Sequence, residues 1–353
     1  MDELFYKAVD LLKEMIAVPS VSRNEKAVAD LVESRLAAEG FSPRRIGNNI
    51  LIAPTPDPAK KTILLNAHLD TVPPADGWSS DAFTPAEDAE GRLYGLGSND
   101  DGASVVSLIA AFTALSSTEQ PYNLMLLLSA EEEVSGKNGI ESVVPELADK
   151  IDFAVVGEPT GMRPAIAEKG LMVLDGEIRG KAGHAARNEG VNAIYKAITV
   201  IDTLRTLSLP HISETLGPVK ISVTQIDAGQ KHNMVPDLCK IVVDVRTTDA
   251  YTNIETLDMI RQAVPDCTLT PRSTRLNPSG ISAAHPFVRR AVRLGLEPFG
   301  SPTLSDQALM PWPSVKIGPG DSARSHTADE YIRLDEIREA IELYVNLLSG
   351  LSI

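Results

Sequence analysis

Three consecutive carboxylates, Glu131, Glu132 and Glu133, follow a short run of apolar residues. The run Tyr122–Leu128 is too short for a typical helix and too apolar for an exposed loop, which favours a buried strand of a parallel sheet. The acids would then stand at the carboxyl end of that strand. Ligands bind at this edge in open α/β sheets, and adjacent like charges are costly there unless a cation or a shared proton offsets them. The acidic run therefore predicts a metal site.

Other candidate ligands occupy the same kind of position, just after a predicted strand or at the start of the following helix. These other candidates are His68, Asp100, Glu158 and His326. With Glu132 and Glu133 of the acidic run, they make six candidate residues. A single parallel sheet would bring them to one edge. Two histidines with several carboxylates suit Zn²⁺, and more than four candidates favour two ions bridged by a carboxylate.

Each of these residues also has an ordinary structural interpretation. His68 could be a hydrogen-bonded core histidine, Asp100 a helix N-cap and His326 an exposed loop residue, while the acidic run could be a solvated helix start. For any one residue alone, the ordinary interpretation is favoured. The repeated placement at strand ends is what favours a metal centre.

Other chemistries find less support in the sequence. Tyr94–Asp100 begins like a dinucleotide-binding fingerprint, but Asp100 stands where the third glycine belongs and no long apolar strand precedes it. The chain has no GxxxxGK[ST] phosphate loop, no GxSxG elbow for a serine nucleophile and no HExxH zinc helix. A metal-assisted reaction is therefore the favoured class.

The elements that must position these residues follow an α/β pattern. Asn24 is a plausible N-cap for the second helix. Apolar periodicity predicts helices over 2–17, 24–40, 103–115 and 335–348, and β-type strands over 49–53, 62–67, 122–128, 151–157 and 314–317. We expect these segments to form a central, mostly parallel sheet covered by helices.

The middle of the chain changes character and predicts an inserted α+β domain. Its order is β-α-β-β-α-β, which is ferredoxin-like. The strands are expected over 170–178, 219–225, 239–245 and 267–270, with helices over 192–207 and 253–263. The predicted domains are 1–164 with 278–353, carrying the metal-binding residues, and 165–277.

The composition limits the class of partner. The 353 residues carry a formal net charge of −15, which argues against nucleic acid or an anionic membrane surface as the main partner. The N-terminus lacks the features of a signal peptide and no stretch reaches eighteen uninterrupted apolar residues, so we expect a cytoplasmic protein. Cys239 and Cys267 form no CxxC pair and are expected to be buried thiols.

Five motifs, in order, resemble those of the M20 metallopeptidase family, and the resemblance covers nearly the whole chain. It implies a zinc-dependent exopeptidase-like catalytic domain with an inserted lid and dimerisation domain. One departure is Leu96, where many relatives place Arg. The motifs are Ala67-His68-Leu69-Asp70, Gly95-Leu96-Gly97-Ser98-Asn99-Asp100-Asp101-Gly102, Ala130-Glu131-Glu132-Glu133, Gly157-Glu158-Pro159-Thr160 and Ser325-His326-Thr327-Ala328-Asp329-Glu330.

The resemblance implies a role for each residue of the site. His68 and Glu158 would bind one Zn²⁺, Glu133 and His326 the other, and Asp100 would bridge them, with Co²⁺ as a possible substitute metal. Glu132 would be the catalytic base. Asp70 would accept a hydrogen bond from His68 and fix its tautomer. The assignment of Glu132 and Glu133 rests on the motif, and a shift by one residue is the alternative.

The inserted domain also resembles the family's lid. His184, in Gly180-Lys181-Ala182-Gly183-His184-Ala185, would reach the active site of the partner subunit in a homodimer and stabilise the oxyanion. Asn233 and Arg246 match positions that contact substrate. The alternatives are that the short His184 motif is a chance match and that Arg246 is a surface ion-pair residue.

The resemblance favours hydrolysis of an N-acyl amino acid, with N-acetyl- or N-succinyl-L-ornithine of arginine biosynthesis as the expected substrate. Arg246 would hold the amino acid carboxylate, and Arg324 would bind a succinyl carboxylate or else form a structural ion pair. The rival enzymes with the same dinuclear centre are a dipeptidase, a carboxypeptidase and a succinyl-diaminopimelate desuccinylase. A non-catalytic metal-binding protein is disfavoured because Glu132 is present.

Overall fold

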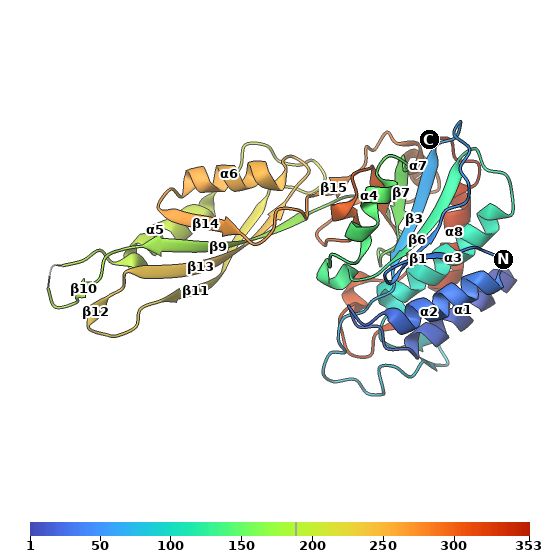
Figure 1. Cartoon of the computed structure of the whole chain (residues 1–353), viewed down its shortest axis with the longest axis horizontal. Coiled ribbons are helices and arrows are strands. Elements are labelled where there is room, and N and C mark those ends of the chain that lie inside the picture. Colours follow the sequence, from blue (N-terminus) through green and yellow to red (C-terminus); the bar gives the residue numbers. More distant parts are fainter. Residues whose placement is uncertain (188) are drawn as a thin grey trace. The chain divides into compact units, whose positions relative to one another are not determined.

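The computed structural model describes residues 1–187 and 189–353, which divide into two units (Figure 1). The first unit holds residues 1–166, 280–299 and 305–353, and the second holds 167–279 with 300–304. These limits lie two residues from the predicted boundaries at 164 and 278. Residues 300–304 were expected in the first domain but pack with the second unit.

The first unit is built on a mixed sheet with strands in the order β1-β2-β6-β3-β7-β17. The four strands from β6 to β17 are parallel, whereas β2 is antiparallel to both of its neighbours. The parallel prediction therefore holds for the middle of the sheet. The strands are β1 (Arg44–Ile46), β2 (Asn49–Ile52), β3 (Thr62–His68), β6 (Asn123–Ser129), β7 (Phe153–Val156) and β17 (Ser314–Lys316).

The central strands are largely apolar because both faces of the sheet are covered. In β3, Ile63 and Leu65 belong to one core, while Leu64 between them belongs to the other. Helices α1, α2, α3, α7 and α8 contribute to the first core, and α4 to the second. This two-sided burial is why no alternation of polar and apolar residues marks these strands in the sequence.

The four predicted helices of the first unit are found near their predicted positions, whereas the short helix α4 and helix α7 were not predicted. The predicted N-cap Asn24 is wrong, because α2 begins after Glu25 and has no side-chain cap. Helix α7 was not predicted, since its three arginines interrupt the apolar pattern. The helices are α1 (Asp2–Ile16), α2 (Lys26–Ala38), α3 (Ala103–Ser116), α4 (Val144–Leu147), α7 (Pro286–Arg293) and α8 (Leu334–Leu348).

Several short strands complete this part of the chain. β18 pairs with β5, and β5 with β4, in a separate three-stranded sheet. β8 is antiparallel to β17 through Ala165 and Lys316. The bounds are β4 (Ala86–Glu87), β5 (Arg92–Tyr94), β8 (Ala165–Glu168), β15 (Ser279–Gly280), β16 (Phe299–Ser301) and β18 (Tyr331–Arg333).

The second unit has the predicted β-α-β-β-α-β order, with an antiparallel sheet β11-β13-β9-β14. Its core lies between this sheet and the two helices and includes both cysteines as free, buried thiols, as predicted. The elements are β9 (Gly170–Arg179), β10 (Gly183–His184), α5 (Ala193–Thr206), β11 (Lys220–Ala228), β12 (Met234–Val235), β13 (Leu238–Thr247), α6 (Asn253–Ala263) and β14 (Cys267–Pro271).

Within the described residues, no helix combines the length and the apolar character needed to cross a membrane.

Candidate metal centre

The predicted ligands of the first unit meet at the carboxyl end of the parallel strands. His68 is the last residue of β3, and the acid loop, defined here as Ala130–Glu133, follows β6 directly. Glu158 lies two residues beyond β7. Asp100 belongs to the helical turn Ser98–Gly102, which leads into α3. Because neighbouring parallel strands end at the same edge, segments far apart in the sequence contribute to one cluster.

The distances place Asp100 between the two histidines. Its Oδ1 lies 3.2 Å from Nε2 of His68, and its Oδ2 lies 3.7 Å from Nε2 of His326. His326 is also 3.0 Å from Oε2 of Glu133. One carboxylate therefore faces both imidazoles, which is the position that a bridging ligand requires.

Two groups of side chains have ligand atoms within 4.8 Å of one another: His68 with Asp100 and Glu133, and His68 with Glu132 and Glu158. Both groups combine imidazole nitrogen with carboxylate oxygen, which suits Zn²⁺ and related divalent ions. The donor set therefore fits the predicted pair of metal ions, and all five predicted ligands lie in this cluster or, for His326, against it.

Asp70 supports the cluster in a different way from the one predicted. Nδ1 of His68 lies 2.9 Å from the backbone carbonyl of Asp70 but 3.5 Å from its carboxylate. The carboxylate accepts hydrogen bonds from the backbone N–H groups of Glu132 and Glu133 at 3.0 and 3.2 Å, and from the hydroxyl of Ser22 at 2.6 Å. The carboxylate of Asp70 therefore orients the acid loop, while its backbone carbonyl orients His68.

The three acids of the loop have different surroundings. Glu131 is buried and has a left-handed backbone (φ 55°), and its carboxylate accepts hydrogen bonds from the main chain and side chain of Asn138. Glu132 lies 4.0 Å from Nε2 of His68. Glu133 contacts His326. Glu131 therefore faces away from the cluster, and the other two acids face into it, which supports the register taken from the motif.

Glu330 was not singled out from the sequence, although it closes the last motif. Its Oε1 accepts hydrogen bonds from the backbone N–H groups of Asn99 and Asp100, both at 2.9 Å. Its side chain is buried. Glu330 thus holds the turn that carries Asp100, and its place four residues after His326 in the motif was the available signal.

The pKa values of Glu132, Glu158 and His326 are all raised, by burial or by neighbouring carboxylates. Burial raises the pKa of Glu132 well above its usual value, and the carboxylates of Glu158 and Glu133 raise it further against the opposing charge of His68. Burial also raises the pKa of Glu158, although Lys316 opposes the shift. The hydrogen bond to Glu133 raises the pKa of His326 to about 9. Without a cation, protons must offset the crowded charges.

His184 and Asn233 lie together in the second unit, on the two-stranded ribbon β10–β12. His184 is directly opposite Met234, and the backbone N–H of Ala185 donates to the carbonyl of Asn233 at 3.0 Å. Both side chains are exposed. Their predicted contacts with substrate require side chains that are not buried in the second unit, and both side chains meet this requirement.

Arg246 lies on β13, where its guanidinium contacts Asp244 at 3.0 Å. It is directly opposite Lys220 of β11. Burial lowers the pKa of Lys169, and the charges of Lys220 and Arg246 lower it further. Three cationic side chains therefore gather at this end of the sheet, and Asp244 offsets only part of their charge.

Arg324 has the structural role that the sequence left open as an alternative. Its guanidinium forms a double hydrogen bond with Glu336 at 2.7 and 3.0 Å and lies over the ring of Tyr331 at 4.6 Å. A bidentate arginine–carboxylate pair is already satisfied. A role for Arg324 in binding a succinyl group would require this pair to open.

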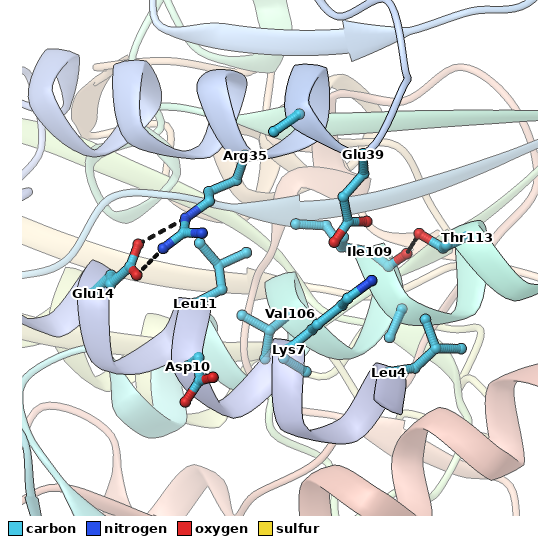
Figure 2. Close-up of a pocket in the computed structure, with 13 residues that line it drawn as sticks. Leu4, Lys7, Asp10, Leu11, Glu14, Arg35, Glu39, Val106, Ile109 and Thr113 are labelled. Atoms are coloured by element: carbon cyan, nitrogen blue, oxygen red, sulfur yellow. Dashed lines mark hydrogen bonds and ion pairs between the residues drawn. The ribbon is translucent and has the colours of Figure 1, made fainter. Parts of the chain in front are cut away.

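A cavity of about 470 Å³ lies between α1, α2 and α3, away from all of these residues (Figure 2). Leu11, Val106 and Ile109 form part of its apolar floor, and Arg35 pairs with Glu14 at its rim. None of the predicted site residues lines it. The cavity therefore contributes nothing to the metal centre.

Residues 64–350 match the family model described as peptidase family M20/M25/M40. The chain belongs to this family. The match spans the metal cluster and the whole second unit, so the predicted resemblance is confirmed. The protein is accordingly a hydrolase that acts on amide bonds.

Curated members of the M20/M25/M40 family resemble the chain along nearly its whole length. An acetylornithine deacetylase of Proteus mirabilis (strain HI4320) is 28% identical, with 97% of this chain and 96% of the relative covered. A putative succinyl-diaminopimelate desuccinylase of Mycobacterium tuberculosis (strain CDC 1551 / Oshkosh) is 29% identical, covering 97% and 98%.

Solved structures show the same fold. The aminopeptidase PepT from Bacillus cereus ATCC 10987 has a TM-score of 0.79 at 18% identity, with 98% of both chains covered. The YXEP protein of Bacillus subtilis, described as a dinuclear metal-binding peptidase of the M20 family, has a TM-score of 0.77 at 14% identity, covering 99% of this chain and 98% of that one.

The geometry predicts that protons compete with the metal. With a pKa of about 9, His326 is protonated at neutral pH and must lose its proton before Nε2 can bind an ion. We expect the apparent affinity for Zn²⁺ or Co²⁺ to rise as pH increases toward 9, as measured by competition with a chelator at constant ionic strength.

Two variants sharpen this measurement. His326→Ala should lower the affinity and flatten its pH dependence, whereas His184→Ala, which removes a histidine outside the cluster, should change neither. An affinity that is independent of pH in the unaltered protein would contradict the placement of His326.

Proposed function

We propose that the protein is a metal-dependent deacylase of N-acyl amino acids, with N-acetyl- or N-succinyl-L-ornithine as substrate and a role in arginine biosynthesis. The observation that carries the proposal is the environment of Glu132. Within the described part of the chain its carboxylate lies beside His68 and Glu158 without a hydrogen bond to either, and burial raises its pKa. A proton carrier needs these properties.

The remaining members of the cluster hold the metal ions in this proposal. His68 and Glu158 would hold one ion and Glu133 and His326 the other, and Asp100 would be shared between them. Zinc ions, or cobalt in their place, when bound, lower the pKa of water toward neutrality and polarise the amide carbonyl. Glu158 lies in one group with His68, and Glu133 contacts His326, which supports this division.

Glu132 moves the proton. Its carboxylate accepts a proton from the attacking water, the water oxygen forms a bond to the amide carbon, and Glu132 then gives the proton to the nitrogen of the leaving amine as the C–N bond breaks. A raised pKa suits both steps, since the group must be a base first and an acid afterwards. The carboxylate of Asp70 accepts a hydrogen bond from the backbone N–H of Glu132 and thereby helps to orient the Glu132 side chain.

Arg246 binds the carboxylate of the amino acid in this proposal. Lys220, directly opposite it, and the nearby Lys169 add positive charge at the same place. A guanidinium with two adjacent ammonium groups suits a carboxylate. Neither lysine could be identified from the sequence, because neither belongs to a motif.

The second unit acts as a lid and forms a homodimer in this proposal, with His184 acting in the partner's site. Strand β13 rises about 27 Å between Leu238 and Arg246. The ribbon that carries His184 and Asn233 therefore lies near one end of this strand, and the cations around Arg246 lie near the other end (Figure 1). One small substrate cannot touch both within one chain. The exposed apolar residues Tyr195, Ile198 and Ile226 provide a surface for a second copy.

A cytoplasmic location stays a prediction from the sequence, and so does the absence of nucleic acid and membrane partners.

Replacing the proposed base tests the mechanism. Glu132→Ala should keep its full complement of zinc, because the ligands are unchanged, but lower kcat by about 10²- to 10⁴-fold. Metal analysis and steady-state kinetics measure the two effects. Zinc loss in proportion to activity would instead make Glu132 a ligand, as in a register shifted by one residue.

A hydrolysis panel tests the substrate. With added zinc or cobalt, we expect turnover of N-acetyl- or N-succinyl-L-ornithine to exceed turnover of N-succinyl-diaminopimelate and of simple dipeptides. Glu132→Ala serves as the control for contaminating activity. Hydrolysis of dipeptides alone would favour the peptidase alternative, and activity on neither ornithine derivative would reject the proposed role in arginine biosynthesis.

Mixing two inactive variants tests the action of His184 in the partner's site. Glu132→Ala and His184→Ala should each be nearly inactive, but hybrid dimers formed after mild dissociation and mixing contain one intact site, so about a quarter of the activity should return. Gel filtration checks the dimer. No recovery in confirmed hybrids would place His184 and Glu132 in the same chain's site or remove His184 from the reaction.

A further inference from the structure

The backbone of the acid loop is held by side chains from three separate parts of the chain. Its four consecutive N–H groups, from Ala130 to Glu133, each donate to a side-chain oxygen. The acceptors are Asn49 for Ala130, Glu25 for Glu131, and the two carboxylate oxygens of Asp70 for Glu132 and Glu133, at 3.0, 3.3, 3.0 and 3.2 Å. Asn49, Glu25 and Asp70 are all completely buried.

Among the residues that the structure describes, the donors to the carboxylate of Glu25 are neutral groups. Its Oε1 accepts hydrogen bonds from the backbone N–H groups of Arg23 and Glu131, and its Oε2 accepts from the amide of Asn48 at 3.1 Å. Glu25 is the residue that precedes α2, and it leaves that helix without a side-chain cap. A buried carboxylate is therefore used to hold the acid loop rather than its own helix.

Asn49 connects the loop to the segment that follows it. Its Oδ1 accepts from the N–H of Ala130, while its amide nitrogen donates to the carbonyls of Ile46 and Asn138 at 2.8 and 2.7 Å. Asn138 in turn binds the carboxylate of Glu131. Both ends of the turn that contains the three acids are thus tied to one side chain of β2.

The loop depends on this support because its own backbone cannot supply it. Glu131 adopts a left-handed conformation (φ 55°), which is unfavourable for a residue with a side chain. The chain then passes so closely that a side chain on Gly136 would clash with Glu131, and one on Gly139 would meet the carbonyl of Ala130 at 2.1 Å. Buried N–H groups in such a turn need acceptors from elsewhere.

We propose that Glu25 and Asn49 are positioning residues for the reaction: they fix the direction of the acid loop and thereby the placement of Glu132. Neither residue belongs to a metal-binding motif, and neither touches the cluster. The kinetic part of this inference rests on the proposed function, whereas the part that concerns the loop backbone does not. Small displacements of a catalytic group are enough to lower turnover strongly.

The test compares Glu25→Ala, Glu25→Gln and Asn49→Ala with Glu33→Gln. Glu33 is the matched control, because it is a carboxylate of the same region that bonds to Arg45 and not to the acid loop. Amide hydrogen exchange of the metal-free proteins, followed in peptides covering 126–137, reports on the loop without substrate or metal. Steady-state kinetics and the zinc-to-protein ratio are measured on the zinc-loaded proteins.

We expect faster exchange over 126–137 in Glu25→Ala and Asn49→Ala but not in Glu33→Gln. In the zinc-loaded enzymes, kcat should fall about 10- to 100-fold, with KM within about threefold of the unaltered value and the zinc ratio unchanged. Glu25→Gln keeps one acceptor oxygen and should recover part of kcat. Because this variant preserves the shape of the side chain, it serves if Glu25→Ala fails to fold.

Two results would overturn the inference. Unchanged exchange over 126–137 in Glu25→Gln and Asn49→Ala would show that the loop does not depend on these acceptors, and faster exchange with unchanged kcat would show that the loop's support does not affect the reaction. If the unaltered protein hydrolyses no substrate in the panel, the proposed function fails, while the exchange measurement still decides whether Glu25 and Asn49 hold the loop.

Discussion

The repulsion between carboxylates gathered at one edge of a buried sheet is the constraint on which this structure depends. Asp100, Glu132, Glu133 and Glu158 lie around two histidines, and burial together with the neighbouring carboxylates raises the pKa of Glu132 and of Glu158. Such a cluster is costly unless protons or cations offset the charge. Metal ions resolve the conflict, because they bind the same oxygens that repel one another.

A second requirement follows, because the acids must also be held in place. The structure meets it with backbone hydrogen bonds to buried side-chain oxygens: Asp70 binds the amides of Glu132 and Glu133, and Glu330 binds those of Asn99 and Asp100. The ligand carboxylates themselves are thereby left free to face the centre. The strands supply the common edge, and these supporting acids determine the direction of each side chain.

The two units contribute different features to the proposed enzyme. The first, with its sheet covered on both faces, provides the rigid edge that the cluster needs. The second has a sheet packed on one side only, so its exposed ribbon and the cations around Arg246 are available to a substrate or another chain. The proposed deacylase uses both features, and the family match over residues 64–350 spans them.

Much of this could be predicted from the sequence, because strand ends, apolar runs and the β-α-β-β-α-β order are local patterns. The five motifs likewise identified the family and every residue of the cluster. Only the tertiary structure decided which way each acid faces, that Arg324 binds Glu336, and that Glu25 holds the acid loop rather than capping its own helix. These features depend on contacts that no local pattern encodes, and the contact of Glu25 with the acid loop joins segments far apart in the chain. A buried hydrogen bond between such segments leaves no periodic signal at either residue, so no local pattern reveals it.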